Sequence, residues 1–440
     1  MQRIRLFRWA VALGAVSVIA AACTEADDGA APGESPTEEG VFLMAADGVL
    51  SDTFIETPES EDMYFSGPAV PAGDAYSNFS AAYEEEYGEP PISAYHAHAY
   101  DATLMLLTAV ENVAEVSGET VTIDRTALRE ELYSTENYQG ITGTLTCDVF
   151  GDCADPNIKV FFNGEDQESL ADVTGEVVFE LDEGEDPLGT DGATAPDYST
   201  DVEPLEIGAG EPFQLASIQV ISTESASLGR DQVRGIELAI ADYGGEFEGH
   251  RITLQSEDGQ CDAEAGATAA ERIVSDPQVV GIIGTSCSGA GVPASQIMSE
   301  AGLVMISGSN TSPFLTSLFG EQGTDWQPGY LRTAHNDQIQ GLAAATYAFE
   351  TLGVTRAATI HDGDPYTQGL AEAFGNSFQE LGGEVTLATA INVGDTDMRP
   401  VLTEVQNSGA EIIYFPIFEP EANFIADQAR DIFGSVRTAA

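Results

Sequence analysis

The chain has 440 residues, and its 74 acidic side chains against 15 basic ones give a formal net charge of −59 at pH 7. Because so negative a surface repels a phosphate backbone, we exclude nucleic acid as a partner. Lys159 is the only lysine. This acid-rich, lysine-poor composition is typical of a strongly solvated surface and does not by itself indicate a site.

The N-terminus has the pattern of a lipoprotein signal peptide. Three arginines precede a short apolar run, residues 9–22, whose last three residues are alanines directly before Cys23. The run is too short to span a bilayer, and no later stretch has the roughly 18 continuous apolar residues that a transmembrane helix needs. We predict cleavage of residues 1–22 and a lipid on Cys23, with an ordinary secretory signal as the alternative. The protein would then be extracytoplasmic, on the cell surface or in the periplasm, and attached to the membrane by its lipid anchor only.

A flexible tether, residues 23–40, is expected to lead into a first folded segment, residues 41–181. Apolar runs and amphipathic stretches in this segment predict strands at Val41–Ala45 and Met63–Gly67 and helices at Phe79–Glu86, Ala97–Val116 and Thr126–Tyr133. A lone buried-type strand directly behind a tether indicates the middle of an α/β domain. Residues 182–210, rich in Asp, Gly, Pro and Thr, predict an acidic linker.

The second folded segment, residues 211–440, alternates apolar runs with amphipathic stretches of helical period, such as Gln232–Tyr243 and Gln368–Leu381. The runs predict strands at Gln214–Val220, Ile252–Leu254, Val279–Gly284, Leu303–Ile306, Ala357–Ile360, Val385–Thr389 and Ile412–Ile417. This alternation is typical of parallel sheets covered by helices. The segment contains neither a dinucleotide-binding nor a P-loop fingerprint, and we expect no cofactor.

Two of these strands end in clusters of small hydroxyl residues. Ser286 and Ser288 follow the strand at 279–284, and Ser309 and Thr311 follow the strand at 303–306. In a parallel sheet such turns lie at the carboxyl ends of the strands, where helix N-termini direct free N–H groups at a bound anion such as a carboxylate. The pattern predicts half of a ligand site, and the alternative is that these side chains only cap helices.

Four cysteines remain after Cys23, and an even number in an exported protein indicates disulfides. Three pairings are possible. Sequence proximity and adjacent strand ends favour Cys147–Cys153 together with Cys261–Cys287. A catalytic thiol at Cys287 is the alternative, but no histidine lies nearby in sequence to activate it.

The motif Tyr95-His-Ala-His-Ala-Tyr100 suggests a metal site at first sight. On the helix expected there, His96 and His98 are two residues apart and point in different directions, so they would not share an ion. The acidic loop at 148–155 lacks the spacing of an EF-hand. We therefore expect no metal site, and instead expect Tyr95 or His96 to line the ligand pocket.

These residues resemble the leucine/isoleucine/valine-binding proteins, the type I periplasmic binding proteins that serve ABC transporters for branched-chain amino acids. The resemblance implies that Ser288, Ser309 and Thr311 hold the α-carboxylate and part of the ammonium group of an amino acid. It also implies that Asp47, in Met44-Ala-Ala-Asp-Gly, pairs with the ammonium. Tyr366, in Asp364-Pro-Tyr-Thr-Gln-Gly, would close over the ligand from the second lobe.

Further positions match the family or depart from it. Phe418 corresponds to an aromatic residue of the side-chain pocket where tyrosine is common, and Cys261 and Cys287 match a family disulfide. Leu228 stands where a bulky aromatic residue is frequent, and Ser286 where an apolar residue is usual. Leucine, isoleucine and valine remain the expected ligands, while a smaller or more polar amino acid, an amide or urea would fit the same frame.

The order of the segments differs from that of the family. Residues 41–181 resemble its C-terminal third and residues 211–440 its N-terminal two-thirds, so the resemblance implies a circularly permuted, two-lobed α/β fold. Each lobe would be a mainly parallel sheet flanked by helices, with strand 41–45 beside 412–417 and four crossings between lobes. Lobe one would comprise about 62–140 and 212–332, and lobe two about 41–61, 141–181 and 333–440. A misassembled gene is the alternative.

The resemblance implies a monomeric, lipid-anchored solute-binding protein that closes its two lobes on an amino acid and delivers it to an ABC permease. Alternatives are a binding protein for an amide or urea, a sensory ligand-binding domain, and an exported hydrolase. A hydrolase would need a nucleophile and a base, but the chain has no Gly-x-Ser-x-Gly elbow and none of its five histidines lies in a recognised catalytic motif.

Overall fold

The computed structural model describes residues 40–181, 189–190 and 192–439. The predicted signal peptide, Cys23 and nearly all of the predicted tether lie outside the described residues. Within the described part, no helix is long and apolar enough to cross a membrane.

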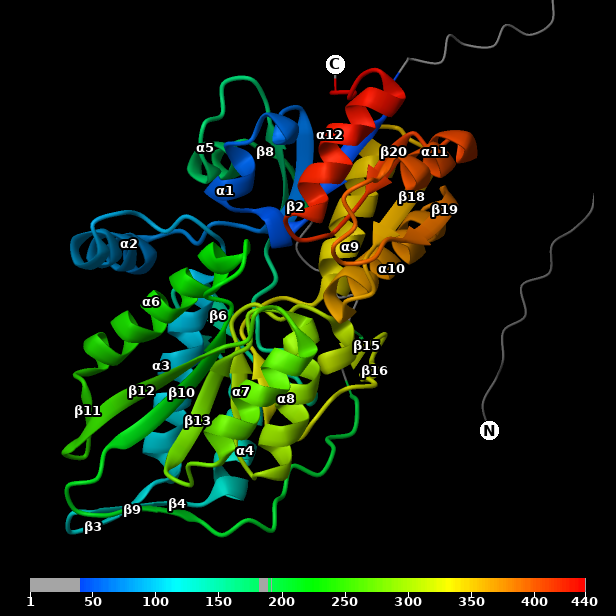
Figure 1. Cartoon of the computed structure of the whole chain (residues 1–440). Coiled ribbons are helices and arrows are strands. Elements are labelled where there is room, and N and C mark those ends of the chain that lie inside the picture. Colours follow the sequence, from blue (N-terminus) through cyan, green and yellow to red (C-terminus); the bar gives the residue numbers. More distant parts are fainter. Residues whose placement is uncertain (1–39, 182–188, 191, 440) are drawn as a thin grey trace, which may run out of the picture. The chain divides into compact units, whose positions relative to one another are not determined.

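Lobe one is built on a six-stranded sheet in the order β11-β12-β10-β13-β14-β17, and Figure 1 shows the neighbours β11, β12, β10 and β13. Its strands are β10 (Phe213–Gln219), β11 (Glu246–Phe247), β12 (His250–Asp258), β13 (Val279–Gly284), β14 (Met305–Ser307) and β17 (Tyr330–Arg332). All neighbours are parallel except the β11-β12 hairpin.

Helices cover both faces of this sheet because successive side chains of each strand point to opposite sides. Ile283 and Ile306 pack in a core with α3 (His96–Val113) and α6 (Ala226–Tyr243). Ile282 and Met305, their neighbours in sequence, pack in a separate core with α7 (Ala263–Val274) and α8 (Ser288–Glu300). The lobe also contains α2 (Asp74–Tyr87), α4 (Arg125–Tyr133) and the hairpins β5-β6 (Tyr138–Gln139, Thr144–Leu145) and β15-β16 (Ser317–Leu318, Glu321–Gln322).

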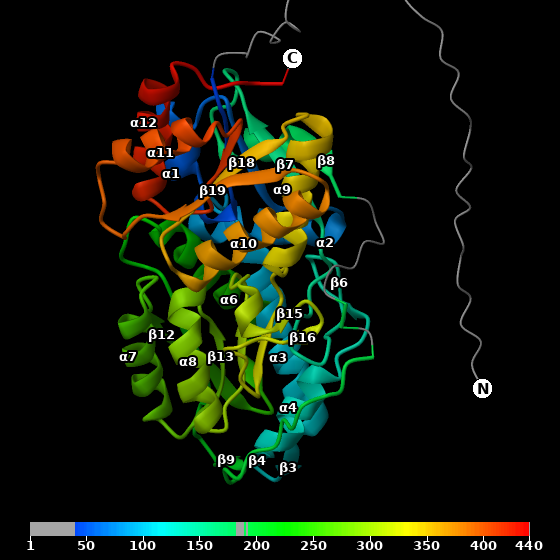
Figure 2. The same ribbon diagram turned by 90° about the vertical axis from the view of Figure 1, so that its right-hand side faces the viewer.

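Lobe two is built on a seven-stranded sheet in the order β19-β18-β20-β1-β2-β7-β8. Its strands are β1 (Phe42–Ala45), β2 (Met63–Pro68), β7 (Ile158–Asn163), β8 (Val177–Glu180), β18 (Arg356–His361), β19 (Glu384–Ala390) and β20 (Ile412–Tyr414). Five neighbouring strands are parallel, and β7 and β8 run antiparallel at one edge. The helices are α1 (Asp52–Ile55), α5 (Leu170–Gly175), α9 (Asp337–Thr346), α10 (Pro365–Glu380), α11 (Arg399–Ser408) and α12 (Glu421–Phe433). Figure 2 shows α9 and α10 together on one side of the sheet.

Strand β1 lies in the middle of this sheet, between β20 and β2. Its register with β20 pairs Phe42 with Ile412 and Met44 with Tyr414 in parallel. All four residues of β1 are buried, as expected for a strand covered on both faces. The prediction that residues 41–45 lie beside 412–417 is confirmed.

Two of the expected lobe boundaries are wrong. Strand β2 pairs with β1 and β7, so lobe one does not begin at residue 62 and the chain crosses only after Pro68. Leu145 and Phe150 pack in the core of lobe one, so residues 141–153 do not belong to lobe two. An apolar run predicts that a strand is buried, but not which of two sheets it joins.

The predicted linker 182–210 is also partly wrong. The ring of Tyr198 stacks on Tyr133 with their centroids 3.9 Å apart. Residues Leu205–Ile207 form β9, which pairs with β4 (Thr120–Ile123) in a small sheet completed by β3 (Glu115–Ser117). The later part of this segment is therefore attached to lobe one, while residues 182–188 and 191 lie outside the described residues.

Candidate functional site

The predicted ligand residues surround one buried space where the carboxyl ends of β1, β13 and β14 meet between the lobes. The space has a volume of about 10 Å³ and is lined by Asp47, Gly48, Tyr95, Leu228, Ser286, Cys287, Ser288, Ser309, Tyr366 and Phe418. Every predicted ligand residue except Thr311 lines it. A volume of this size holds one water molecule at most, so an amino acid could enter only after the lobes separate.

Asp47 is the acidic group of the site and lies in the turn directly after β1. Its side chain is 5% exposed. Oδ2 accepts a hydrogen bond from the Tyr95 hydroxyl at 2.8 Å, and Oδ1 accepts from Gln340 Nε2 at 2.6 Å and from the Tyr366 hydroxyl at 3.1 Å. Three donors from two lobes therefore hold one carboxylate in place.

The lobe-one wall is formed by the two hydroxyl clusters. Ser309 donates to the carbonyl oxygen of Ser286 at 2.8 Å, and Ser286 donates to Gln219 Oε1 at 2.6 Å. Ser288 accepts a hydrogen bond of 3.3 Å from the backbone N–H of Ser312. None of these hydroxyls caps α8, whose N-cap is Cys287 without a side-chain bond. These hydroxyls therefore leave the N–H groups in the first turn of α8 unoccupied, and the N–H of Gly289 meets the carboxylate of Asp364 instead.

Thr311 is placed differently from the other predicted residues. It is fully buried behind the wall, and its hydroxyl has no hydrogen-bond partner of ordinary geometry among the described residues. Its carbonyl oxygen accepts a 3.0 Å hydrogen bond from the backbone N–H of Asp337. Thr311 therefore touches the start of α9 instead of lining the space.

Aromatic side chains close the remaining sides. The rings of Tyr366 and Phe418 lie with centroids 5.0 Å apart, and Leu228 packs in the same apolar cluster as Tyr95 and Phe418. Burial and the nearby charge of Asp47 raise the pKa of Tyr95 well above its usual value, so its hydroxyl stays protonated and can donate. This wall suits an apolar group next to a charged one.

The two lobes also touch at the start of α10. Ser312 of lobe one donates to the carbonyl oxygen of Pro365 at 2.9 Å. The carboxylate of Asp364 reaches the backbone of Gly289 in the first turn of α8. Burial raises the pKa of Asp364 to about 7, although the N–H groups of Tyr366 and Gly289 oppose the shift. The described conformation is therefore a closed one.

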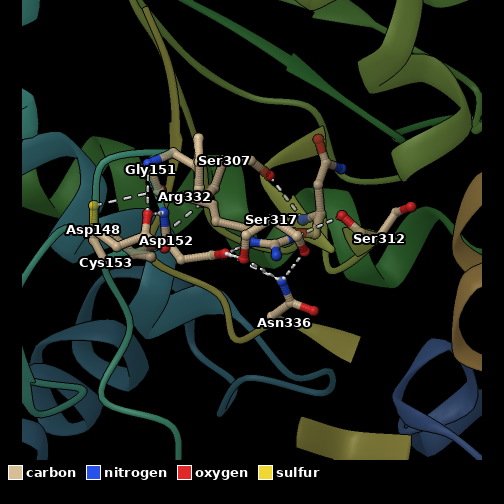
Figure 3. A network of polar contacts seen from close by, with 12 residues as sticks. Asp148, Gly151, Asp152, Cys153, Ser307, Ser312, Ser317, Arg332 and Asn336 are labelled. Atoms are coloured by element: carbon tan, nitrogen blue, oxygen red, sulfur yellow. Dashed lines mark hydrogen bonds and ion pairs between the residues drawn. The ribbon is translucent and has the colours of Figure 1, made fainter. Parts of the chain in front are cut away.

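A buried polar network supports the lobe-one wall from behind (Figure 3). The guanidinium of Arg332, at the end of β17, donates to Asp152 Oδ1 at 2.5 Å and to the carbonyl oxygens of Asn310 and Ser312 at 3.1 and 2.9 Å. Ser317 and Asn336 donate to the other oxygen of Asp152 at 3.0 and 3.1 Å. Arg332 thereby fixes the loop that carries Thr311 on both sides.

The predicted disulfides are present, but His96 lies away from the ligand space. Both favoured disulfides, Cys147–Cys153 and Cys261–Cys287, are confirmed, and Cys287 is thereby not a free thiol. His96 does not line the space: its Nε2 lies 3.0 Å from the Tyr76 hydroxyl and its Nδ1 lies 2.9 Å from the Ser93 carbonyl oxygen.

Sequence reasoning missed three residues of this region. Gln340 donates to Asp47, Asp364 meets α8, and Asp337 is fully buried at the first position of α9. Burial and the charge of Asp47 raise the pKa of Asp337 well above its usual value, while Thr311 and Arg332 oppose the shift. A usable signal was the spacing of Asp337 and Gln340, because residues three apart share one face of a helix.

The chain is similar in sequence to known binding proteins. A family model described as periplasmic binding protein matches residues 38–150 and 212–434. An amino acid binding protein of Pseudomonas aeruginosa is 32% identical over 209 residues, which cover 47% of this chain and 54% of that protein. The Leu/Ile/Val-binding protein homolog 2 of Brucella abortus is 30% identical over 229 residues, covering 52% and 57%. The Leu/Ile/Val-binding protein of Escherichia coli is 29% identical over 225 residues, covering 50% and 58%.

The chain thus spans about half the length of the curated relatives it matches. Among solved structures, the leucine binding protein of Thermotoga maritima aligns with a TM-score of 0.44 and 26% identity, covering 50% of this chain and 60% of that one.

Proposed function

The chain belongs to the periplasmic binding protein family, and we propose that it is an extracytoplasmic solute-binding protein that captures a branched-chain or related amino acid for an ABC importer. The relatives that it matches are named as amino acid or Leu/Ile/Val-binding proteins. In this reading the protein binds and releases its ligand without converting it.

The observation that carries the proposal is that one side of the small space suits an anion and the opposite side suits a cation. Ser288 and Ser309 on lobe one, beside the start of α8, offer hydroxyl groups, and Asp47 on lobe two offers a carboxylate. A zwitterion buried between the lobes would have both of its charges met, whereas burial of either charge unpaired is costly. An α-amino acid carries these two charges on adjacent atoms.

The apolar wall supports a hydrocarbon side chain on that amino acid. Leu228, Phe418 and Tyr95 form one cluster beside Asp47. In this proposal the side chain of leucine, isoleucine or valine lies against the cluster, and the hydroxyl of Tyr95 stays on Asp47.

Capture requires motion because the closed space is far smaller than an amino acid. The contacts Tyr95–Asp47 and Ser312–Pro365 join residues of different lobes, so they would break when the lobes separate. Ligand binding would favour the closed form, which the permease would recognise. The chain segments that cross between the lobes, among them residues 69–73 and 333–336, would act as hinges.

We also propose the lipid anchor on Cys23 and delivery of the ligand to a membrane permease. The support is the sequence pattern around Cys23 and the family match. Mass spectrometry of the protein extracted from membranes should find a lipidated N-terminal Cys23. Cys23→Ala should release the protein from the membrane fraction, and a membrane-bound Cys23→Ala protein would contradict the anchor.

The order of the segments is a further part of the proposal: we infer that the chain is a circular permutation of the family's fold. Strand β1 precedes β20 by most of the chain, yet it pairs with it in parallel, and Val41 also bridges Val436. The family match falls in two blocks on either side of the segment around residues 182–210.

The decisive experiment is calorimetric titration of the purified chain with leucine, isoleucine, valine and a panel of other amino acids, amides and urea. Binding of one stoichiometric amino acid supports the proposal and names the ligand. A cooperatively folded protein that binds none of the amino acids contradicts it. Exclusive binding of an amide or urea would move the protein to that ligand class.

A further inference from the structure

A cluster of three buried electron-pair donors lies beside the amino-acid space. It consists of Asp47, His335 and Asp337, and one ligand atom of each lies within 4.8 Å of the others. Their side chains are 5%, 3% and 0% exposed. Asp47 follows β1, whereas His335 and Asp337 flank the N-cap of α9, so only the tertiary fold brings them together.

The orientation of Gln340 determines which nitrogen of His335 is free. Nε2 of Gln340 donates to Asp47 Oδ1 at 2.6 Å and to the Ser66 carbonyl oxygen at 3.0 Å, two groups that can only accept. Oε1 of Gln340 therefore faces His335 Nε2, with which it forms a hydrogen bond. An amide oxygen only accepts, so Nε2 carries the proton and Nδ1 carries a lone pair.

Two members of this cluster, His335 and Asp337, have lone pairs that no hydrogen bond of ordinary geometry satisfies among the described residues. Nδ1 of His335 and both carboxylate oxygens of Asp337 have no hydrogen-bond partner of ordinary geometry among the described residues. The hydroxyl of Thr311 makes no hydrogen bond of ordinary geometry either, but it lies close enough to Asp337 to oppose the rise of that pKa. Asp47 accepts three hydrogen bonds, and a carboxylate offers about four acceptor positions. Buried acceptors without donors are costly, and a cation is their natural complement.

We propose that Asp47, Asp337 and one imidazole nitrogen of His335 form a binding site for a divalent transition-metal ion such as Zn²⁺. One imidazole nitrogen with two carboxylate oxygens is a donor set that suits zinc, whereas calcium and magnesium prefer oxygen alone. Gln340 forms hydrogen bonds with both His335 and Asp47, and residues that orient metal ligands commonly form such bonds. Asp47 is shared with the proposed amino-acid site, but the metal proposal does not depend on which amino acid is bound.

The test is a titration of the chelator-treated, purified chain with ZnCl₂ at pH 7, followed by calorimetry and by the visible spectrum of Co²⁺ in place of Zn²⁺. We expect one stoichiometric site with a micromolar or lower Kd. Asp337→Asn and His335→Gln should each weaken binding at least tenfold, and His335→Gln should change the Co²⁺ spectrum. His250→Gln, at the amino end of β12, and the exposed Asp397→Asn are the matched controls and should leave the Kd unchanged.

Leucine titration of the same metal-free samples separates this proposal from the proposed function. Zinc binding that is unchanged in both Asp337→Asn and His335→Gln would overturn the site, as would the absence of stoichiometric zinc binding. If zinc does not bind and Asp337→Asn instead lowers leucine affinity, the cluster belongs to the amino-acid site. Asp337→Asn removes a fully buried carboxylate that makes no hydrogen bond of ordinary geometry among the described residues, so we expect it to fold, and circular dichroism checks this.

Discussion

The hydroxyl of Tyr95, at the start of α3 in lobe one, donates a 2.8 Å hydrogen bond to Oδ2 of Asp47 in lobe two. Both side chains are buried, at 3% and 5% exposure. The bond therefore links the lobes at Asp47, the acidic side chain that lines the ligand space in the described part of the chain. The proposed ligand ammonium must therefore share Asp47 with this hydroxyl.

Replacement of Asp47 by alanine should weaken amino-acid binding by roughly 2–5 kcal/mol, because the ammonium would be buried without its partner. Calorimetry with the tightest-binding amino acid measures the change. Asp74→Ala, an exposed aspartate of α2, is the control and should bind like the wild type. Tyr95→Phe removes only one of the three donors to Asp47 and should have the smaller effect. An Asp47→Ala protein with wild-type affinity would refute the assignment.

The stability of the protein should fall as pH rises because of Asp364. Its pKa is raised from 3.8 to about 7 by burial. Between these values the folded protein keeps a proton that the unfolded chain has lost, so unfolding becomes easier as pH increases. Above about pH 7 the Asp364 carboxylate is charged in both states. The cost of burying this charge then lowers the free energy of unfolding by at most about 4 kcal/mol.

Asp364→Asn should therefore flatten the curve of unfolding free energy against pH from about 4 to 7 and stabilise the protein most above pH 7. Denaturant titrations at a series of pH values measure this. Burial also raises the pKa of Asp148 to about 7, but Asp148 is present in both proteins and cancels in the comparison. Parallel curves for wild type and variant would contradict the prediction.

The buried pair Arg332–Asp152 should contribute far more to stability than an exposed pair of the same kind. Arg332→Met removes the partner of a carboxylate that is 7% exposed and should cost about 3–5 kcal/mol. Arg399→Met is the matched control, because Arg399 and Asp397 are 57% and 64% exposed and such pairs contribute about 1 kcal/mol or less. Urea denaturation compares the two variants. Equal losses would contradict the role of the network in Figure 3.

A rearranged gene tests the proposed permutation. Residues 189–434 would be joined directly to residues 41–181, which restores the order that the resemblance implies and keeps Tyr198 on Tyr133. Gly40 already contacts Ser435, and Val41 N donates to the Ser435 carbonyl oxygen at 3.3 Å, so the new junction needs little distortion. We expect the same amino-acid affinity, because every residue that lines the ligand space is kept. The free energy of unfolding should be lower, because the rearranged chain lacks the hydrogen bonds between Val41 and residues 435–437. A rearranged chain that folds but does not bind, while the original binds, would contradict the permutation.

The pattern of residues close in sequence predicted much of the fold and part of the candidate site. The apolar run at β13 and the hydroxyl residues after it predicted a strand, a polar turn and the start of α8, because each of these depends on residues close in sequence. Both disulfides were predicted for the same reason: each follows from spacing or from adjacent strand ends. The boundaries at residues 62 and 141 and the linker character of Leu205–Ile207 were wrong, because periodicity does not identify the sheet that a strand joins.

The sequence by itself determined the α/β class, the positions of most strands and helices, and the hydroxyl residues that line the space, while the role of Asp47 came from the resemblance to a known family. Only the tertiary structure decided that Gln340 holds Asp47, that Asp364 meets the start of α8, and that His335 and Asp337 converge with Asp47. The physical reason is separation along the chain: burial and electrostatic interaction act through space, and no periodic pattern links the turn after β1 to the start of α9.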